Sequence, residues 1–235
     1  MQGTLEGAIA AVTGETVKIV GSGRTDAGAH ALRQVIAFST HSPLPAAVLC
    51  RAVNAHLPDD IAVTSVCDVD PSFHPRYDAS SRVYRYLVWN RSVRSPFWTG
   101  RAAHVPYRLD EGVMGQAAAS LVGARDLAAF VPAAIRRDTR REIYRAACWR
   151  EGDLLLIELE ANGFMRQMVR AIVGTLLEVG LGKMAPSDFE RILLSGDRRR
   201  AGRTVPAAGL YLMNVRYPPN IQAALRLGPG AGPAG

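Results

Sequence analysis

Gly21-Ser-Gly-Arg-Thr-Asp-Ala-Gly-Ala-His-Ala31 is a glycine-rich stretch in which one carboxylate, Asp26, follows two residues after one guanidinium, Arg24. A short β-branched run over residues 17–20 precedes it, and an alternating run over residues 34–40 follows it. Both runs are typical of strands, so the stretch is predicted to be a loop between two strands. Loops on a rigid scaffold often carry chemistry. Asp26 and Arg24 are therefore candidate functional residues.

The glycines of this loop match neither of two familiar phosphate-binding motifs. The dinucleotide fingerprint G-x-G-x-x-G joins a strand to a helix, whereas here Gly28 comes two residues late and a strand follows. The P-loop needs Lys and then Ser or Thr after its last glycine, and Ala29 and His30 occupy those positions. From spacing alone, an exposed Arg–Asp pair of little energetic value remains an equal alternative to a functional pair.

Length and charge place limits on the function. A chain of 235 residues allows one large domain or two small ones. The net charge of +7 favours a polyanionic partner but does not distinguish RNA from DNA or a membrane surface. Nearly all of the positive charge is arginine, with Lys18 and Lys183 as the lysines. The planar guanidinium suits phosphate oxygens better than an ammonium does.

Several other classes of protein are not indicated. The chain has no apolar run of the roughly 18 residues that a membrane helix needs, and its start does not resemble a signal peptide. The three cysteines, Cys50, Cys67 and Cys148, form no C-x-x-C pair, so neither a zinc site nor a disulfide framework is predicted. We expect a cytoplasmic protein with no membrane association and no metal site.

The hydrophobic periodicity predicts a mixed chain of helices and strands. The order of elements favours an α+β fold, with helices on one side of a largely antiparallel sheet. The segment from residue 218 to 235 is rich in proline and glycine and is predicted to be a disordered tail. Strands are expected over 61–69, 82–89 and 210–217, a hairpin over 142–161, and helices over 5–14, 45–56, 110–123, 164–179 and 189–194.

Motifs along nearly the whole chain resemble those of the TruA family of tRNA pseudouridine synthases, in the same order. The loop contains Gly-Arg-Thr-Asp-Ala-Gly-x-His-Ala, and the C-terminal half contains Gly163-Phe-Met-Arg-Gln-Met-Val-Arg170. Together the matched motifs extend from about residue 2 to residue 217. The other similar segments lie at residues 54–61, 73–79, 82–86, 174–177, 197–198 and 209–212.

This resemblance implies the pseudouridine synthase fold, with two α/β subdomains whose largely antiparallel sheets meet at a basic cleft. Residues 1–80 would form the catalytic subdomain and residues 81–217 the second one. The family opens with a strand and a tryptophan-containing segment before its first helix, whereas this chain starts at Met1-Gln-Gly-Thr. The first subdomain is therefore expected to lack a central strand and to expose unpaired strand edges. A non-catalytic RNA-binding remnant is the alternative function.

The resemblance also implies a reaction and its residues. Pseudouridine formation breaks the N-glycosidic bond of a uridine, turns the base and rejoins it through C5, so no cofactor is expected. Asp26 would be the nucleophile, at ribose C1′ or uracil C6, and Arg24 would steady its charge. Tyr84 would stack on the extruded base and relay a proton, and Arg170 would reach the carboxylate. Arg166 is given no role. A hydrolase with an aspartate nucleophile is disfavoured, since no second carboxylate is placed as its acid–base partner.

The expected substrate is the anticodon stem-loop of tRNA at positions 38–40, bound across both subunits of a homodimer. RNA contacts are expected from Arg76, Arg82, Arg85 and His30. Weaker candidates, each of which is more often a solvated surface residue, are His74, Arg136, Arg137, Arg140, Arg141, Arg198, Arg199 and Arg200.

Overall fold

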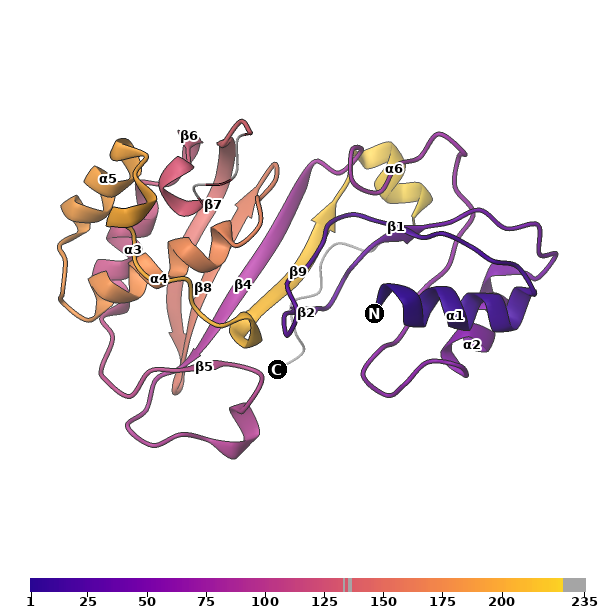
Figure 1. Ribbon diagram of the computed structural model, residues 1–235, viewed down its shortest axis with the longest axis horizontal. Helices are drawn as coiled ribbons and strands as arrows, with labels where there is room; N and C mark the ends of the chain where they lie inside the picture. Colours follow the sequence, from indigo (N-terminus) through magenta and orange to yellow (C-terminus); the bar gives the residue numbers. More distant parts are fainter. Residues whose placement is uncertain (133, 135–136, 226–235) are drawn as a thin grey trace. The chain divides into compact units, whose positions relative to one another are not determined.

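The computed structural model describes residues 1–225 apart from 133, 135 and 136, and the chain divides into two compact units (Figure 1). The first unit comprises Met1–Arg24, Gln34–Ser80 and the residues from Arg216 onward. The second comprises Thr25–Arg33 and Ser81–Val215. One break between the units follows Ser80. The second half of the glycine-rich loop belongs to the second unit.

The first unit is built around two helices that share a small apolar core. Leu5 and Ile9 of the first helix are buried with Leu49 and Val53 of the second. The first helix ends at Gly14, whose φ of 74° is easily adopted only by glycine. The strands that flank the loop are present but short, and they pair antiparallel. The elements are α1 (Gln2–Thr13), β1 (Val20–Gly21), β3 (Ile36–Ala37), α2 (Ala46–Asn54) and α6 (Pro219–Ala224).

The predicted strand over residues 61–69 is wrong, because this segment is irregular. The side chain of Asn54, at the end of α2, explains the difference. Its Nδ2 donates to the carbonyl oxygen of Val63 at 2.8 Å, and its Oδ1 accepts from the Val63 amide at 2.7 Å. Both backbone groups of Val63 therefore bond to a side chain instead of a neighbouring strand.

The predicted disordered tail is wrong for its first part, which forms α6. Pro219 occupies the first turn, where a missing backbone N–H costs nothing. Leu225 at the end of the helix is buried, and Gln222 accepts a hydrogen bond from the backbone amide of Tyr217 at 3.3 Å. These contacts attach the helix to the first unit. Residues 226–235 lie outside the described residues.

The second unit is a mixed sheet in the strand order β2-β9-β4-β8-β7-β6, with β5 also pairing β4. The pairs β4–β8, β7–β8 and β6–β7 are antiparallel, while β2–β9 and β4–β5 are parallel. This confirms the α+β fold. The strands are β2 (His30–Ala31), β4 (Ser81–Trp89), β5 (Ala103–His104), β6 (Gly123–Asp126), β7 (Arg140–Glu151), β8 (Leu154–Ala161) and β9 (Leu210–Arg216).

Three α-helices cover one face of this sheet: α3 (Glu111–Ala119), α4 (Met168–Gly180) and α5 (Pro186–Ser195) (Figure 1). Asp110 caps the N-terminus of α3, since its carboxylate accepts from the amides of Gly112 and Val113. The predicted hairpin is confirmed, with Gly152 at φ 57° in its turn. By contrast, α4 begins at Met168 instead of 164, because Gln167 has a left-handed φ of 63° that no helix continues.

Replacement of Gly174 by alanine is expected to destabilise the protein strongly. A Cβ at this position of α4 would lie 1.8 Å from the carbonyl oxygen of Arg203 and 3.0 Å from its carbonyl carbon. Backbone atoms cannot rotate away as a side chain can, so the neighbouring segment must shift. We expect a loss of about 3 kcal/mol, at the upper end of overpacking costs, and a melting temperature lower by roughly 6–12 °C for a chain of this size.

Gly115 in α3 provides the matched control. It is also a helical glycine, but a Cβ there would meet nothing within 4 Å. Gly115→Ala should therefore stabilise the protein by about 0.5–1 kcal/mol through its helix propensity. Thermal melts of the two variants test the packing, and equal melting temperatures would contradict the close approach at Gly174.

Candidate active site

The loop that carries Asp26 is attached to the sheet of the second unit. The Ala29 amide donates to the Asp26 carbonyl at 3.0 Å, which closes a β-turn with Gly28 at its third position. The φ of 83° at Gly28 is the value that a type II turn requires there. Directly after the turn, β2 pairs with β9, with His30 opposite Tyr211. Asp26 is thus only four residues away in the sequence from His30, where β2 is paired with β9.

Arg170, in the first turn of α4, contacts the Asp26 carboxylate. Its Nη1 lies 2.5 Å from Oδ2 of Asp26, and its Nε donates to the carbonyl oxygen of Val205 at 2.7 Å. The side chains are only 15% and 21% exposed for Arg170 and Asp26, respectively. A charge-assisted bond shielded from water is stronger than a surface pair. The second bond, to Val205, fixes the guanidinium so that the carboxylate has a defined position.

Arg166 was given no role in the sequence analysis, yet it also lies near Asp26. Its Nε is 3.9 Å from Oδ1 of Asp26, and its side chain is 76% exposed. The spacing of four residues between Arg166 and Arg170 could have indicated that both side chains lie near Asp26. However, Gln167 has a left-handed φ, so Arg166 lies before the helix that contains Arg170. Two arginines therefore approach different oxygens of one carboxylate, one from a shielded position and one from the surface.

Tyr84 lies on β4 and is close enough to Asp26 to interact with its charge. The ring packs edge-on against Phe164, with centroids 5.4 Å apart and planes at 88°. Burial raises the pKa of the Tyr84 hydroxyl, the charge of Asp26 raises it further, and Arg82 opposes both. The phenol is therefore protonated at neutral pH and can donate a hydrogen bond or a proton.

Arg24 is exposed and belongs to the first unit. Within the described part of the chain, the ion-pair partners of the Asp26 carboxylate are Arg170 and Arg166, both from the second unit. The contact of Arg170 is the one that the resemblance implies. A role for Arg24 itself stays a prediction.

Arg85 and His30, two of the expected RNA contacts, are engaged within the second unit. The Arg85 guanidinium is 2.8 Å from Glu158, is 15% exposed and lies 5.1 Å from the centroid of the Trp149 ring. His30 stacks on Tyr211, with centroids 4.5 Å apart, and its Nε2 is 3.0 Å from the carbonyl oxygen of Gly100. These contacts leave the Arg85 guanidinium paired and shielded from solvent and hold the His30 ring in place.

The other candidate RNA contacts occupy varied positions. Arg82 donates to the Asn162 carbonyl at 2.8 Å, and Arg76 is exposed in the first unit beside the Tyr77 ring. His74 accepts from two backbone amides and therefore stabilises its own turn. Arg198 bonds to its own loop, and Arg199 pairs with Asp197, whereas Arg141 bonds to nearby carbonyls. Arg137, Arg140 and Arg200 are exposed, and Arg136 lies outside the described residues.

Other kinds of site are not found in the described residues. No group of three His, Cys, Asp or Glu side chains there could hold a metal ion. Burial raises the pKa of Cys148 to about 12, so it is not an activated nucleophile. A search of the same residues for helices able to cross a membrane also finds none.

Comparisons with known proteins show the family to which this chain belongs. A family model described as tRNA pseudouridine synthase matches residues 1–78 and 117–218. The tRNA pseudouridine synthase A of Thermoanaerobacter sp. (strain X514) is 43% identical over 218 residues, which cover 92% of this chain and 89% of that protein. The enzyme of the same name from Methylacidiphilum infernorum is 39% identical over 225 residues, covering 95% and 88%. The chain therefore belongs to the tRNA pseudouridine synthase family.

Proposed function

We propose that this protein isomerises uridine to pseudouridine in the anticodon stem-loop of tRNA, at positions 38–40, with Asp26 as the nucleophile. The observation that carries the proposal is the pairing of Asp26 with the shielded guanidinium of Arg170, next to the neutral phenol of Tyr84. Membership of the tRNA pseudouridine synthase family supports the same reaction.

The chemistry requires an attacking carboxylate, a way to hold the released base and a proton transfer. Asp26 attacks either ribose C1′ or uracil C6, and the C1′–N1 bond breaks. The base turns, a bond forms between C1′ and C5, and the bond to Asp26 breaks, which regenerates the carboxylate. The C5 proton is lost and N1 is protonated, so the product is an isomer of the substrate. Arg170 positions the carboxylate. Tyr84, whose ring is held by Phe164, stacks on the extruded uracil and can relay a proton.

The target uridine must leave its stack before Asp26 can reach it, which costs a few kcal/mol and is easiest in or near a loop. Arg76 and Arg82 are proposed to hold the RNA backbone, and His30 to support the catalytic loop beside it. We further propose a cytoplasmic homodimer, with one tRNA lying across both subunits. Sedimentation velocity of the purified protein tests the dimer.

Incubation with an unmodified tRNA transcript, followed by chemical mapping of pseudouridine, tests the activity. The expected result is modification confined to positions 38–40. Binding of the transcript without any product would favour the alternative, a non-catalytic RNA-binding protein. Product at other positions would contradict the assignment of the anticodon stem-loop.

Binding of tRNA is expected to weaken steeply with salt. The net charge of +7 is the reason, because each phosphate neutralised by an arginine releases counterions. Several such contacts should lower the affinity at least about tenfold between roughly 50 and 200 mM salt. Fluorescence anisotropy with a labelled transcript measures this, and an affinity that does not change with salt would contradict binding through phosphates.

A further inference from the structure

Residues 91–108, which join β4 to α3, form a basic segment rich in exposed aromatic side chains. It contains four arginines and no aspartate or glutamate. Phe97 is 85% exposed, Val93 72% and Tyr107 71%. Large exposed apolar side chains that share one basic segment are candidates for an interaction site. None of these residues has a role in the site described above.

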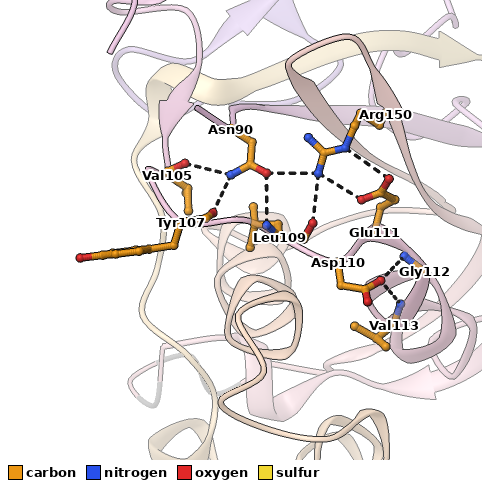
Figure 2. A network of polar contacts seen from close by, with 9 residues as sticks. All are labelled: Asn90, Val105, Tyr107, Leu109, Asp110, Glu111, Gly112, Val113 and Arg150. Atoms are coloured by element: carbon orange, nitrogen blue, oxygen red, sulfur yellow. Dashed lines mark hydrogen bonds and ion pairs between the residues drawn. The ribbon is translucent and has the colours of Figure 1, made fainter. Parts of the chain in front are cut away.

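The backbone of this segment is held firmly, so its exposed side chains are presented on a fixed support. Asn90 donates through Nδ2 to the carbonyl oxygens of Val105 and Tyr107, and Arg150 bonds to Asn90, to the Leu109 carbonyl and to Glu111 (Figure 2). Figure 2 shows the Tyr107 ring pointing away from this network.

The earlier part of the segment is attached in a similar way. Trp89 of β4 stacks on Trp98, with centroids 6.4 Å apart, and its Nε1 donates to the Val93 carbonyl at 2.9 Å. In addition, β5 pairs with β4 through residues of this segment. A surface that needs little ordering on binding loses less conformational entropy when a partner arrives.

The segment also contacts the loop that carries Asp26. His30, four residues after Asp26, lies with Nε2 3.0 Å from the Gly100 carbonyl oxygen, and Tyr211 donates its hydroxyl proton to the Arg101 carbonyl at 2.8 Å. His30 and Tyr211 stack on each other. These contacts lie within the second unit and place Gly100 and Arg101 beside the strand that directly follows the Asp26 loop.

The chemistry of the segment favours RNA over a second copy of the protein. Unpaired nucleotides are bound by stacking on aromatic rings and by arginine contacts to phosphate. A symmetric dimer through this face would place four arginines against four arginines with no acidic residue of the segment between them, which like-charge repulsion disfavours. Among the described ion pairs, Arg91 is the only arginine of the segment that has a carboxylate partner.

We propose that residues 91–108 bind the unpaired nucleotides that flank the target uridine. Phe97 and Tyr107 stack on bases, and Arg94 and Arg101 contact phosphates. The segment thereby holds the anticodon loop open beside Asp26. This inference rests on the proposed function, but its test measures binding and needs no turnover.

The experiment compares the Phe97→Ala/Tyr107→Ala double variant with the wild type in binding an anticodon stem-loop RNA and a blunt duplex of the same stem. Stacking on one aromatic ring contributes about 1–3 kcal/mol per base, so the stem-loop affinity should fall at least about tenfold, while the duplex affinity should not change. Leu194→Ala is the matched control, because Leu194 is 78% exposed on α5 and lies outside the segment. Both changes are at the surface, so thermal melts should match the wild type.

A second variant tests the arginines. Arg94→Gln/Arg101→Gln should reduce the slope of log affinity against log salt by about 2, which is about 1 for each lost phosphate contact. Arg191→Gln on α5 should leave the slope unchanged. Wild-type affinity of the aromatic double variant for the stem-loop would overturn the proposal. If the wild type sediments as a dimer and the aromatic double variant as a monomer, the proposal is also overturned, because a second copy of the protein then covers this face. Stem-loop binding by a wild-type protein that forms no pseudouridine would contradict the proposed function alone.

Discussion

Asp26→Asn should form no detectable pseudouridine while binding tRNA almost as tightly as the wild type. Asparagine has nearly the same shape, but its amide cannot act as the nucleophile. Loss of a covalent nucleophile removes catalysis by factors of at least about 10³. Binding should persist, because the phosphate contacts proposed above lie elsewhere. Single-turnover mapping of pseudouridine and anisotropy with the same transcript measure the two quantities separately.

Asp153→Asn is the control for the change of charge. Asp153 also pairs with an arginine, Arg91 at 3.2 Å, but its side chain is 41% exposed and lies in the turn between β7 and β8. Turnover of this variant should match the wild type. Turnover of Asp26→Asn close to the wild-type rate would end the nucleophile assignment, and an equal loss in both variants would attribute the effect to net charge.

Arg170→Met should lower kcat by about 10²–10³, the loss typical of removing one positioned electrostatic contact at a reacting group. The variant leaves Asp26 without the guanidinium that contacts Oδ2 and leaves the Val205 carbonyl without its donor. Arg170→Lys keeps the charge, but a single ammonium cannot reproduce the guanidinium fork. It should recover only part of the activity. Because the residue acts on the position of the carboxylate, kcat should change more than KM.

Arg166→Met provides the comparison on the other side of the same carboxylate. The Arg166 side chain is 76% exposed and 3.9 Å from Asp26, so solvent weakens its interaction. Its loss should be at most about tenfold, as expected for an exposed pair worth 1 kcal/mol or less. Equal losses in the two arginine variants would contradict the distinction between shielded and exposed partners. Thermal melts separate an effect on the site from unfolding.

The sequence predicted the elements that depend on local pattern. The helix expected over 5–14 corresponds to α1, the strand expected over 82–89 to β4 and the helix expected over 110–123 to α3. Periodicity and capping depend on residues a few positions apart, so they can be read without knowing the rest of the fold. The prediction over residues 61–69 failed because Asn54 bonds to the backbone of Val63, which no periodic pattern reveals.

The sequence by itself therefore determined the α+β class, the family resemblance and the choice of Asp26 as the reactive group. Only the tertiary structure decided how Asp26 is held: the pairing of β2 with β9, the second bond of Arg170 to the Val205 carbonyl and the nearby exposed Arg166. It also decided that Arg85 pairs with Glu158 instead of facing solvent. The physical reason is that these contacts join segments whose meeting depends on how strands and helices pack together. Side-chain chemistry sets which contacts are favourable, and only the packed fold selects those that form.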